Sequence, residues 1–228
     1  MATTFRSVAS NAAGASTTVV IANPAGMVDG DVLQACIAWT GGGITMTPPA
    51  GWTLVPDSFT VSGALNGSMY TKVAAGEPAS WTWTASLATN ITGAVHALTG
   101  GDQSTPAGAT LGAAYGQGAA IAAPSVMAAL GHQMLVAMFV TSVSPTTYTV
   151  DTPMIERADL NATGITMATA TEFFDPEGPT GVRYATAASG AGLSNLAVLM
   201  TLSVDRRVVV QYATLSLEDA PTGVLVFA

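Results

Sequence analysis

The fold is decided by residues 24–55, PAGMVDGDVLQACIAWTGGGITMTPPAGWTLV. The apolar run Val32–Trp39 is long enough to cross a β-sandwich core as one strand. The triplet Gly41–Gly43 ends this run, because glycine permits backbone angles that a strand does not keep. A second turn then closes at Gly51-Trp52, where the indole can plug the end of a core. The stretch therefore predicts a strand, a glycine hinge and a second strand.

The rest of the chain continues with short β-branched or alternating segments between Gly, Pro and Asn turns. The further candidate strands are 17–22, 44–47, 52–55, 68–74, 81–84, 91–98, 131–140, 148–158, 165–174, 182–187 and 193–204. No segment keeps a helical period between caps, although the Ala-rich residues 119–130 can form a turn or two of helix. Residues 103–120 are rich in Gly, Ala, Ser and Pro and are interpreted as a connecting loop. We expect an all-β protein.

Aromatic side chains mark the predicted core. The expected structural or core residues are Trp39, Gly51, Trp52, Tyr70 and Trp83. Trp81 and Trp83 alternate with threonine, so both indoles lie on one face of a strand. A face of paired indoles can stack on sugars, but no Asp, Asn or Arg cluster stands beside it. A core face or a subunit interface is the favoured interpretation, with Trp81 as a candidate interface residue.

Composition indicates an unusual surface. Hydrophobic residues make up 49% of the chain and charged residues only 9%, against about 25% charged in typical domains. One interpretation is a secreted or viral β-protein with a surface rich in Thr and Ser. The other, which we favour, is a subunit of a permanent assembly that covers its surface with neighbours.

The charge and the chain ends exclude several classes of protein. The net charge is −8, with six Lys and Arg against 14 Asp and Glu, which argues against nucleic-acid binding because phosphates require a basic footprint. The N-terminus lacks the charged and apolar regions of a signal peptide. No apolar run approaches the ~18 residues of a membrane helix. We expect a soluble protein made in the cytoplasm, with Cys36 as a small buried hydrophobe.

The two halves of the chain echo each other in layout. Pro24 precedes Gly30-Asp31 and an apolar strand, and Pro124 precedes Gly131-His132 and another. Two arrangements are compatible with this echo: tandem sandwiches of about one hundred residues each, or one jelly roll built of two Greek keys. Because each half offers few strands, we favour a single jelly-roll-like β-sandwich of two echoing Greek-key halves. We expect an N-terminal arm at 1–16, the sandwich at 17–204 and a C-terminal strand or arm extension at 205–228.

The C-terminal extension is predicted to contact other subunits. Its apolar end would be an aggregation hazard if it were left free, so it pairs in its own sheet or adds a strand to a neighbour. The candidate interface residues here are Arg206, Arg207, Val224, Leu225, Val226 and Phe227.

No residue pattern identifies a reaction. His96 and His132 have no Cys or Glu at metal-ligand spacing, so neither predicts a zinc site. The carboxylates Glu156, Asp159, Glu172 and Asp175 are interpreted as solvated loop charges rather than as a glycosidase pair or a calcium site. We therefore assign no catalytic, cofactor-binding or metal-binding residue and do not expect an enzyme.

Five local patterns carry a resemblance. They are Gly30-Asp31 before an apolar strand, the turn Pro49-Ala50-Gly51-Trp52, the strand Tyr70–Val73, Glu77-Pro78 with Trp83, and Gly101-Asp102. Together they resemble a β-sandwich module of predicted structural proteins of tailed bacteriophages and prophages, and of some bacterial surface proteins. The match covers about residues 17–105 and continues more weakly to 204.

The resemblance implies a role in the virion and transfers no functional residue. It suggests a capsid decoration (cement) protein, which stabilises the head through subunit contacts as a homo-oligomer, for which we expect a trimer. The major capsid protein or other virion subunits would be its partners. The alternative is a receptor- or carbohydrate-binding module of a tail tip or fibre, with Trp81 and Trp83 as its platform.

Overall fold

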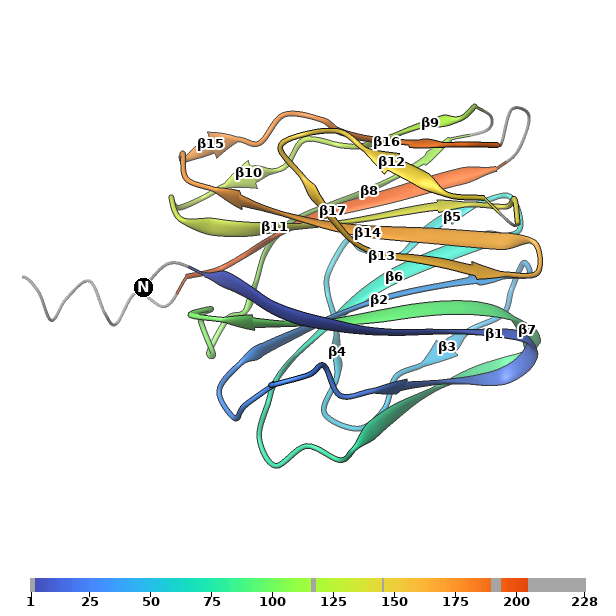
Figure 1. Cartoon of the computed structure of the whole chain (residues 1–228), viewed down its shortest axis with the longest axis horizontal. Helices are drawn as coiled ribbons and strands as arrows, with labels where there is room; N and C mark the ends of the chain where they lie inside the picture. Colours follow the sequence, from blue (N-terminus) through green and yellow to red (C-terminus); the bar gives the residue numbers. More distant parts are fainter. Residues whose placement is uncertain (1–2, 116–117, 145, 190–193, 205–228) are drawn as a thin grey trace, which may run out of the picture.

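The computed structural model describes residues 3–115, 118–144, 146–189 and 194–204, which form stacked layers of β-sheet (Figure 1). Every regular element in these residues is a strand, so the all-β prediction is confirmed. The part of the chain described contains no helix that could span a membrane.

The first half supplies seven strands. They are β1 (Thr4–Ala22), β2 (Val32–Thr40), β3 (Met46–Thr47), β4 (Thr53–Leu54), β5 (Thr60–Ser62), β6 (Leu65–Val73) and β7 (Ser80–Thr99). Their sheet has the order β1-β7-β2-β6-β4, with β3 beside β7 and β5 beside β6, and all its pairings are antiparallel.

The long strands β1 and β7 form a ribbon that bends back over its own sheet. Their pairing shifts register between Ala13 and Thr18, and Ala15 adopts a φ of 46° at this bend. Figure 1 shows the blue ribbon of β1 crossing the sheet, turning at its right end and returning below. The outer ends of β1 and β7, joined by β3, therefore cover the outer face of the sheet that the inner ends help to build.

The described residues of the second half supply ten strands. They are β8 (Ala107–Tyr115), β9 (Ala120–Ala123), β10 (Met127–Ala128), β11 (Gln133–Thr141), β12 (Tyr148–Val150), β13 (Ile155–Ala162), β14 (Ile165–Phe174), β15 (Gly178–Pro179), β16 (Arg183–Ala187) and β17 (Asn195–Leu202). An inner sheet has the order β13-β14-β11-β17-β8, an outer sheet has the order β12-β16-β9, and β10 pairs with β15.

The two halves repeat one pairing order. In β2, Cys36 lies between Met69 of β6 and Ala94 of β7. In β11, Met138 lies between Thr169 of β14 and Val198 of β17. In both inner sheets the first of these strands, β2 or β11, therefore lies between the two later ones. The sheet pairings thus show the echo, while the jelly-roll topology stays a prediction.

Three hydrophobic cores separate the layers. The central core lies between the two inner sheets and includes Cys36, Met69, Met138 and Val198. One outer core lies under the bent ribbon of the first half, and the other lies under the β12-β16-β9 sheet. The inner strands are thus covered on both faces, which explains why β2 and β11 are mostly apolar rather than alternating.

Two segments differ from the predictions. Residues 1–16 were expected as an arm or a first edge strand, separate from the strand 17–22, but β1 runs from Thr4 to Ala22 and pairs with β7 at the edge of the sheet. Residues 103–120 were expected as a loop, but Ala107–Tyr115 is an edge strand paired with β17. Small residues are required there, because a Cβ on Gly112 would collide with the Thr60 hydroxyl of the neighbouring β5. The Ala-rich stretch 119–130 contains β9 and β10 and no helical turn.

Candidate functional site

The aromatic residues of the opening stretch meet in the outer core of the first half. Trp52 packs edge-on against Trp81, with ring centroids 5.3 Å apart, and against Trp83 at 5.2 Å. Tyr70 lies 6.5 Å from Trp83. Trp39 is also buried, and its Nε1 donates to the carbonyl of Ile44. The structure thus places Trp39, Trp52, Tyr70 and Trp83 in the core, as the sequence predicts. Trp81, a candidate interface residue, is buried in the same core.

A polar clamp holds the same cluster together. Nζ of Lys72 lies 2.7 Å from Oε2 of Glu77, and Trp81 Nε1 donates to the same carboxylate oxygen at 3.0 Å. Burial alone raises the pKa of Glu77, but the hydrogen bonds from Lys72, the Ala75 amide and Trp81 outweigh it and lower the pKa. Gly51 turns with a φ of 84° against Lys72, so three of the quoted sequence motifs meet in one place.

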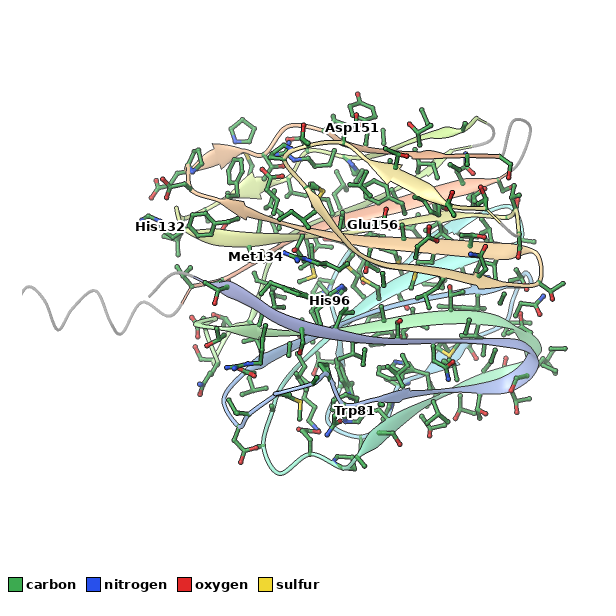
Figure 2. All side chains as sticks on the ribbon, in the orientation of Figure 1. Trp81, His96, His132, Met134, Asp151 and Glu156 are labelled. Carbon is green, nitrogen blue, oxygen red and sulfur yellow. The ribbon has the colours of Figure 1, made fainter. Side chains whose placement is uncertain are left out.

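The proposed sugar platform is wrong for this fold. Trp81 is only 3% exposed and Trp83 is 0% exposed, as the alternating burial of the outer part of β7 requires. Figure 2 shows Trp81 inside the lower layers of the molecule. An indole that stacks on a sugar must present its face to solvent, so these two residues serve the core instead.

A second polar cluster joins the two halves through the central core. His96 is fully buried, with Nδ1 3.0 Å from Oε1 of Gln34 and Nε2 3.0 Å from Oγ1 of Thr169 (Figure 2). Burial lowers the pKa of His96, the hydrogen bond with Gln34 opposes this, and the nearby Arg157 lowers the pKa further. The net pKa is about 4. His96 is therefore neutral at pH 7 and bridges the halves by hydrogen bonds.

The cations of the described residues are engaged within the fold. Arg6 binds Asp31 through two hydrogen bonds of 2.7 and 3.0 Å. Arg183 pairs with Glu172 in the same way. Arg157 donates to Thr171, and its guanidinium lies 3.8 Å above the ring of Phe5. Lys72 is paired with Glu77. Each lysine or arginine of the described residues therefore either faces a carboxylate or, in the case of Arg157, packs against Thr171 and Phe5.

The four carboxylates expected as solvated loop charges do not form one site, and the expectation of loops is wrong for Glu156, Asp159 and Glu172, which lie in strands. Glu172 is buried in its pair with Arg183, whereas Asp175 pairs with His132 at the surface. Glu156 and Asp159 lie along the edge strand β13, where burial raises both pKa values and Asp159 raises that of Glu156 further. Among the described residues, no group of three or more His, Cys, Asp or Glu could hold a metal.

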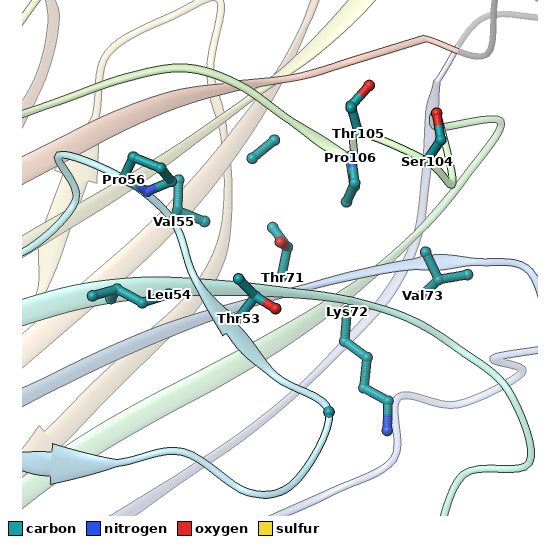
Figure 3. A pocket seen from close by; sticks show the side chains of 12 residues that line it. Thr53, Leu54, Val55, Pro56, Thr71, Lys72, Val73, Ser104, Thr105 and Pro106 are labelled. Atoms are coloured by element: carbon teal, nitrogen blue, oxygen red, sulfur yellow. The ribbon is translucent and has the colours of Figure 1, made fainter.

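Two clefts flank the connection between the halves. The first, of about 390 Å³, lies between β4, β6 and residues 104–107. Figure 3 shows Lys72 directed away from Ser104 and Thr105 on the opposite wall. The hydroxyls of Ser104 and Thr105 already donate to Asp102, and Lys72 is bound to Glu77. Few polar groups are therefore left to recognise a ligand in this cleft.

The second cleft, of about 270 Å³, lies between β8, β10, β11 and β17. Its polar lining includes Asp102, Gln133 and Thr201, which belong to separate segments of the chain. Sequence reasoning missed these residues, because an isolated Gln or Thr in an apolar strand has no recognisable motif. The one available clue was that polar residues interrupt two otherwise apolar strands.

Of the remaining residues singled out in the sequence, Cys36 lies in the central core and the C-terminal ones are not described. Cys36 is fully buried, which raises the pKa of its thiol to about 12. The predicted interface residues Arg206, Arg207, Val224, Leu225, Val226 and Phe227 lie outside the described residues.

No protein-family model, no curated protein and no solved structure matches this chain.

Proposed function

We propose that the chain is a non-enzymatic structural subunit of a bacteriophage virion, most specifically a decoration (cement) protein of the head. In this proposal its β-sandwich is jelly-roll-like, and it acts as a homo-oligomer, a trimer, bound to the major capsid protein or to other virion subunits. The resemblance of the local sequence patterns is the observation that carries the proposal. Residues of three of these patterns form the Trp52–Lys72–Glu77–Trp81 cluster, which supports the view that the patterns exist for a structural reason.

The stacked architecture supports a mechanical role. Three cores clamp four layers of sheet, and the polar cluster at His96 links the halves. A scaffold with both inner sheets buried on both faces resists deformation, because close-packed interiors have low compressibility. Such a body can brace neighbouring shell subunits without changing shape.

The edge formed by β4 and β5 is the contact surface that we assign to neighbouring subunits. Leu54, Phe59 and Val61 are 46%, 54% and 45% exposed along this edge. Subunit interfaces are enriched in aromatic residues and poor in charge at their centre. The engagement of the described cations within the fold also supports contact with protein rather than with nucleic acid.

The proposal is tested on particles. Purified phage or prophage particles that contain this protein are analysed by mass spectrometry and labelled with gold-conjugated antibody against it. We expect the label on the head surface, and we expect a homo-oligomer of the purified protein in multi-angle light scattering. Label on the tail alone, or a monomer at high concentration that fails to bind empty capsids, would contradict the decoration role.

The contact surface has its own test. Phe59→Ser and Val61→Ser are expected to weaken head binding or oligomer formation at least tenfold. Leu87→Ser is the matched control, since Leu87 is 65% exposed at a different edge. An equal loss for Leu87→Ser would show that the β4–β5 edge is not the contact surface.

The alternative, a receptor- or carbohydrate-binding module of a tail tip or fibre, cannot use Trp81 and Trp83 as its platform because both are buried. The second cleft is the observation that favours a ligand-binding role.

A further inference from the structure

The second cleft is a concave site at one end of the second half. Its volume is about 270 Å³, below the 300 Å³ at which pockets for drug-sized ligands begin. The lining residues that matter are Asp102, Gly108, Met127, Leu130, Gln133 and Thr201. A cleft of this size holds a single small ring rather than an extended molecule.

Two buried polar groups line the cleft without a partner. Gln133 is 2% exposed and Thr201 is 0% exposed. Neither Oε1 of Gln133 nor Oγ1 of Thr201 makes a hydrogen bond with another group of the described residues. Because buried polar atoms are almost always hydrogen-bonded, such a pair marks a place where a ligand can complete the bonding.

Gly108 lies directly against the buried Thr201 hydroxyl. A Cβ at this position would collide with Oγ1 of Thr201 and lie 3.0 Å from the carbonyl oxygen of Thr201. Any other residue at position 108 would therefore displace the hydroxyl from its place beside the cleft.

The rest of the lining defines the chemistry of the ligand. The carboxylate of Asp102 is held in place by hydrogen bonds from the Ser104 amide and hydroxyl at 2.8 and 2.6 Å. Met127, which is 59% exposed, and the half-buried Leu130 add apolar surface. None of the described residues that line the cleft is a Lys, Arg or His, so none of them would neutralise an anion.

We propose that this cleft binds one neutral sugar residue. A pyranose carries hydroxyls that both donate and accept, which suits the amide of Gln133, the hydroxyl of Thr201 and the carboxylate of Asp102. Its C–H face suits Met127 and Leu130. The proposal does not depend on the role in the virion, because a head or tail protein could carry the site equally.

The test uses the full chain and a panel of methyl glycosides of glucose, galactose, mannose, N-acetylglucosamine and rhamnose. Saturation-transfer NMR measures the binding of each glycoside. At least one glycoside is expected to bind saturably. Thr201→Val, which removes the hydroxyl and keeps the shape, is expected to weaken that binding at least tenfold. Gly108→Ala is expected to weaken binding as well, because its methyl group would collide with the Thr201 hydroxyl and displace it.

Thr141→Val is the matched control. Thr141 is also 0% exposed and its Oγ1 also has no partner among the described residues, but it lies at the opposite end of β11 and does not line the cleft. The Thr141→Val variant is expected to bind the glycoside as tightly as the unmodified protein does. The proposal is overturned if no glycoside of the panel binds, if Thr141→Val weakens binding as much as Thr201→Val, or if short peptides bind the cleft and sugars do not.

Discussion

Nε2 of His96, in the first half of the chain, lies 3.0 Å from Oγ1 of Thr169, in the second half. This contact crosses the central core, where hydrophobic packing otherwise joins the two inner sheets. A buried hydrogen bond in such a place has a directional requirement that apolar contacts lack, so it helps to set how the halves align.

The first prediction concerns the pH dependence of this contact. The unfolded chain binds a proton at the histidine near pH 6.5, whereas burial keeps His96 neutral in the fold down to about pH 4. The stability that the fold gains by keeping His96 neutral is therefore fully present above pH 6.5, and it falls as the pH drops from 6.5 to 4. The total loss in the free energy of unfolding is about 3 kcal/mol. Urea titrations at several pH values measure it.

The double variant Gln34→Val/His96→Met is the control for this prediction. It copies the corresponding pair of the second half, in which Val136 lies opposite Met200. Its free energy of unfolding is expected to depend less on pH between 6.5 and 4 than that of the unmodified chain. If both proteins show the same slope, His96 is not the titrating group.

The second prediction concerns the clamp at Glu77. Glu77→Gln removes the charge that faces Lys72 and is expected to lower the free energy of unfolding by about 3 kcal/mol, because it leaves a partly buried ammonium without a counter-charge. Thermal unfolding followed by tryptophan fluorescence reports it directly, since Trp81 donates to the same carboxylate. The exposed Glu177→Gln is expected to change stability by less than about 0.5 kcal/mol. Similar effects at both positions would exclude a clamp.

The third prediction tests the strand Ala107–Tyr115. Gly112→Ala places a methyl group against Thr60 and is expected to cost about 1–3 kcal/mol through overpacking. Gly42→Ala faces open space in the glycine triplet and is expected to be neutral or slightly stabilising. Chemical denaturation of the two variants compares them. A neutral Gly112→Ala would mean that β8 does not pack beside β5.

The fourth prediction concerns the thiol of Cys36. The residue is fully buried and its pKa is raised to about 12, so the native protein should react with a disulfide reagent far more slowly than the unfolded chain. Release of thionitrobenzoate with and without denaturant measures both rates. Rapid reaction of the native protein would show that the central core opens.

Much of the strand content could be predicted because it depends on local patterns. The strand Ile165–Phe174 and the apolar strand after Asp31 follow from alternation, apolar runs and turn residues. Residues 107–115 were mistaken for a loop because Ala and Gly have low strand propensity. Their strand exists because β17 offers a partner and β5 leaves room only for small residues.

The candidate sites, like the strands, depend partly on local sequence and partly on contacts between distant segments. By itself, the sequence determined that the chain is all-β, that its halves share a layout and that Trp39, Trp52 and Trp83 belong to a core, since these properties are encoded in neighbouring residues. Only the tertiary structure decided that Trp81 faces inward and that the buried residues Gln133 and Thr201 line one cleft. The physical reason is that a side chain's exposure and its lack of a partner depend on strands that are distant in sequence, and a local pattern does not specify which strands these are.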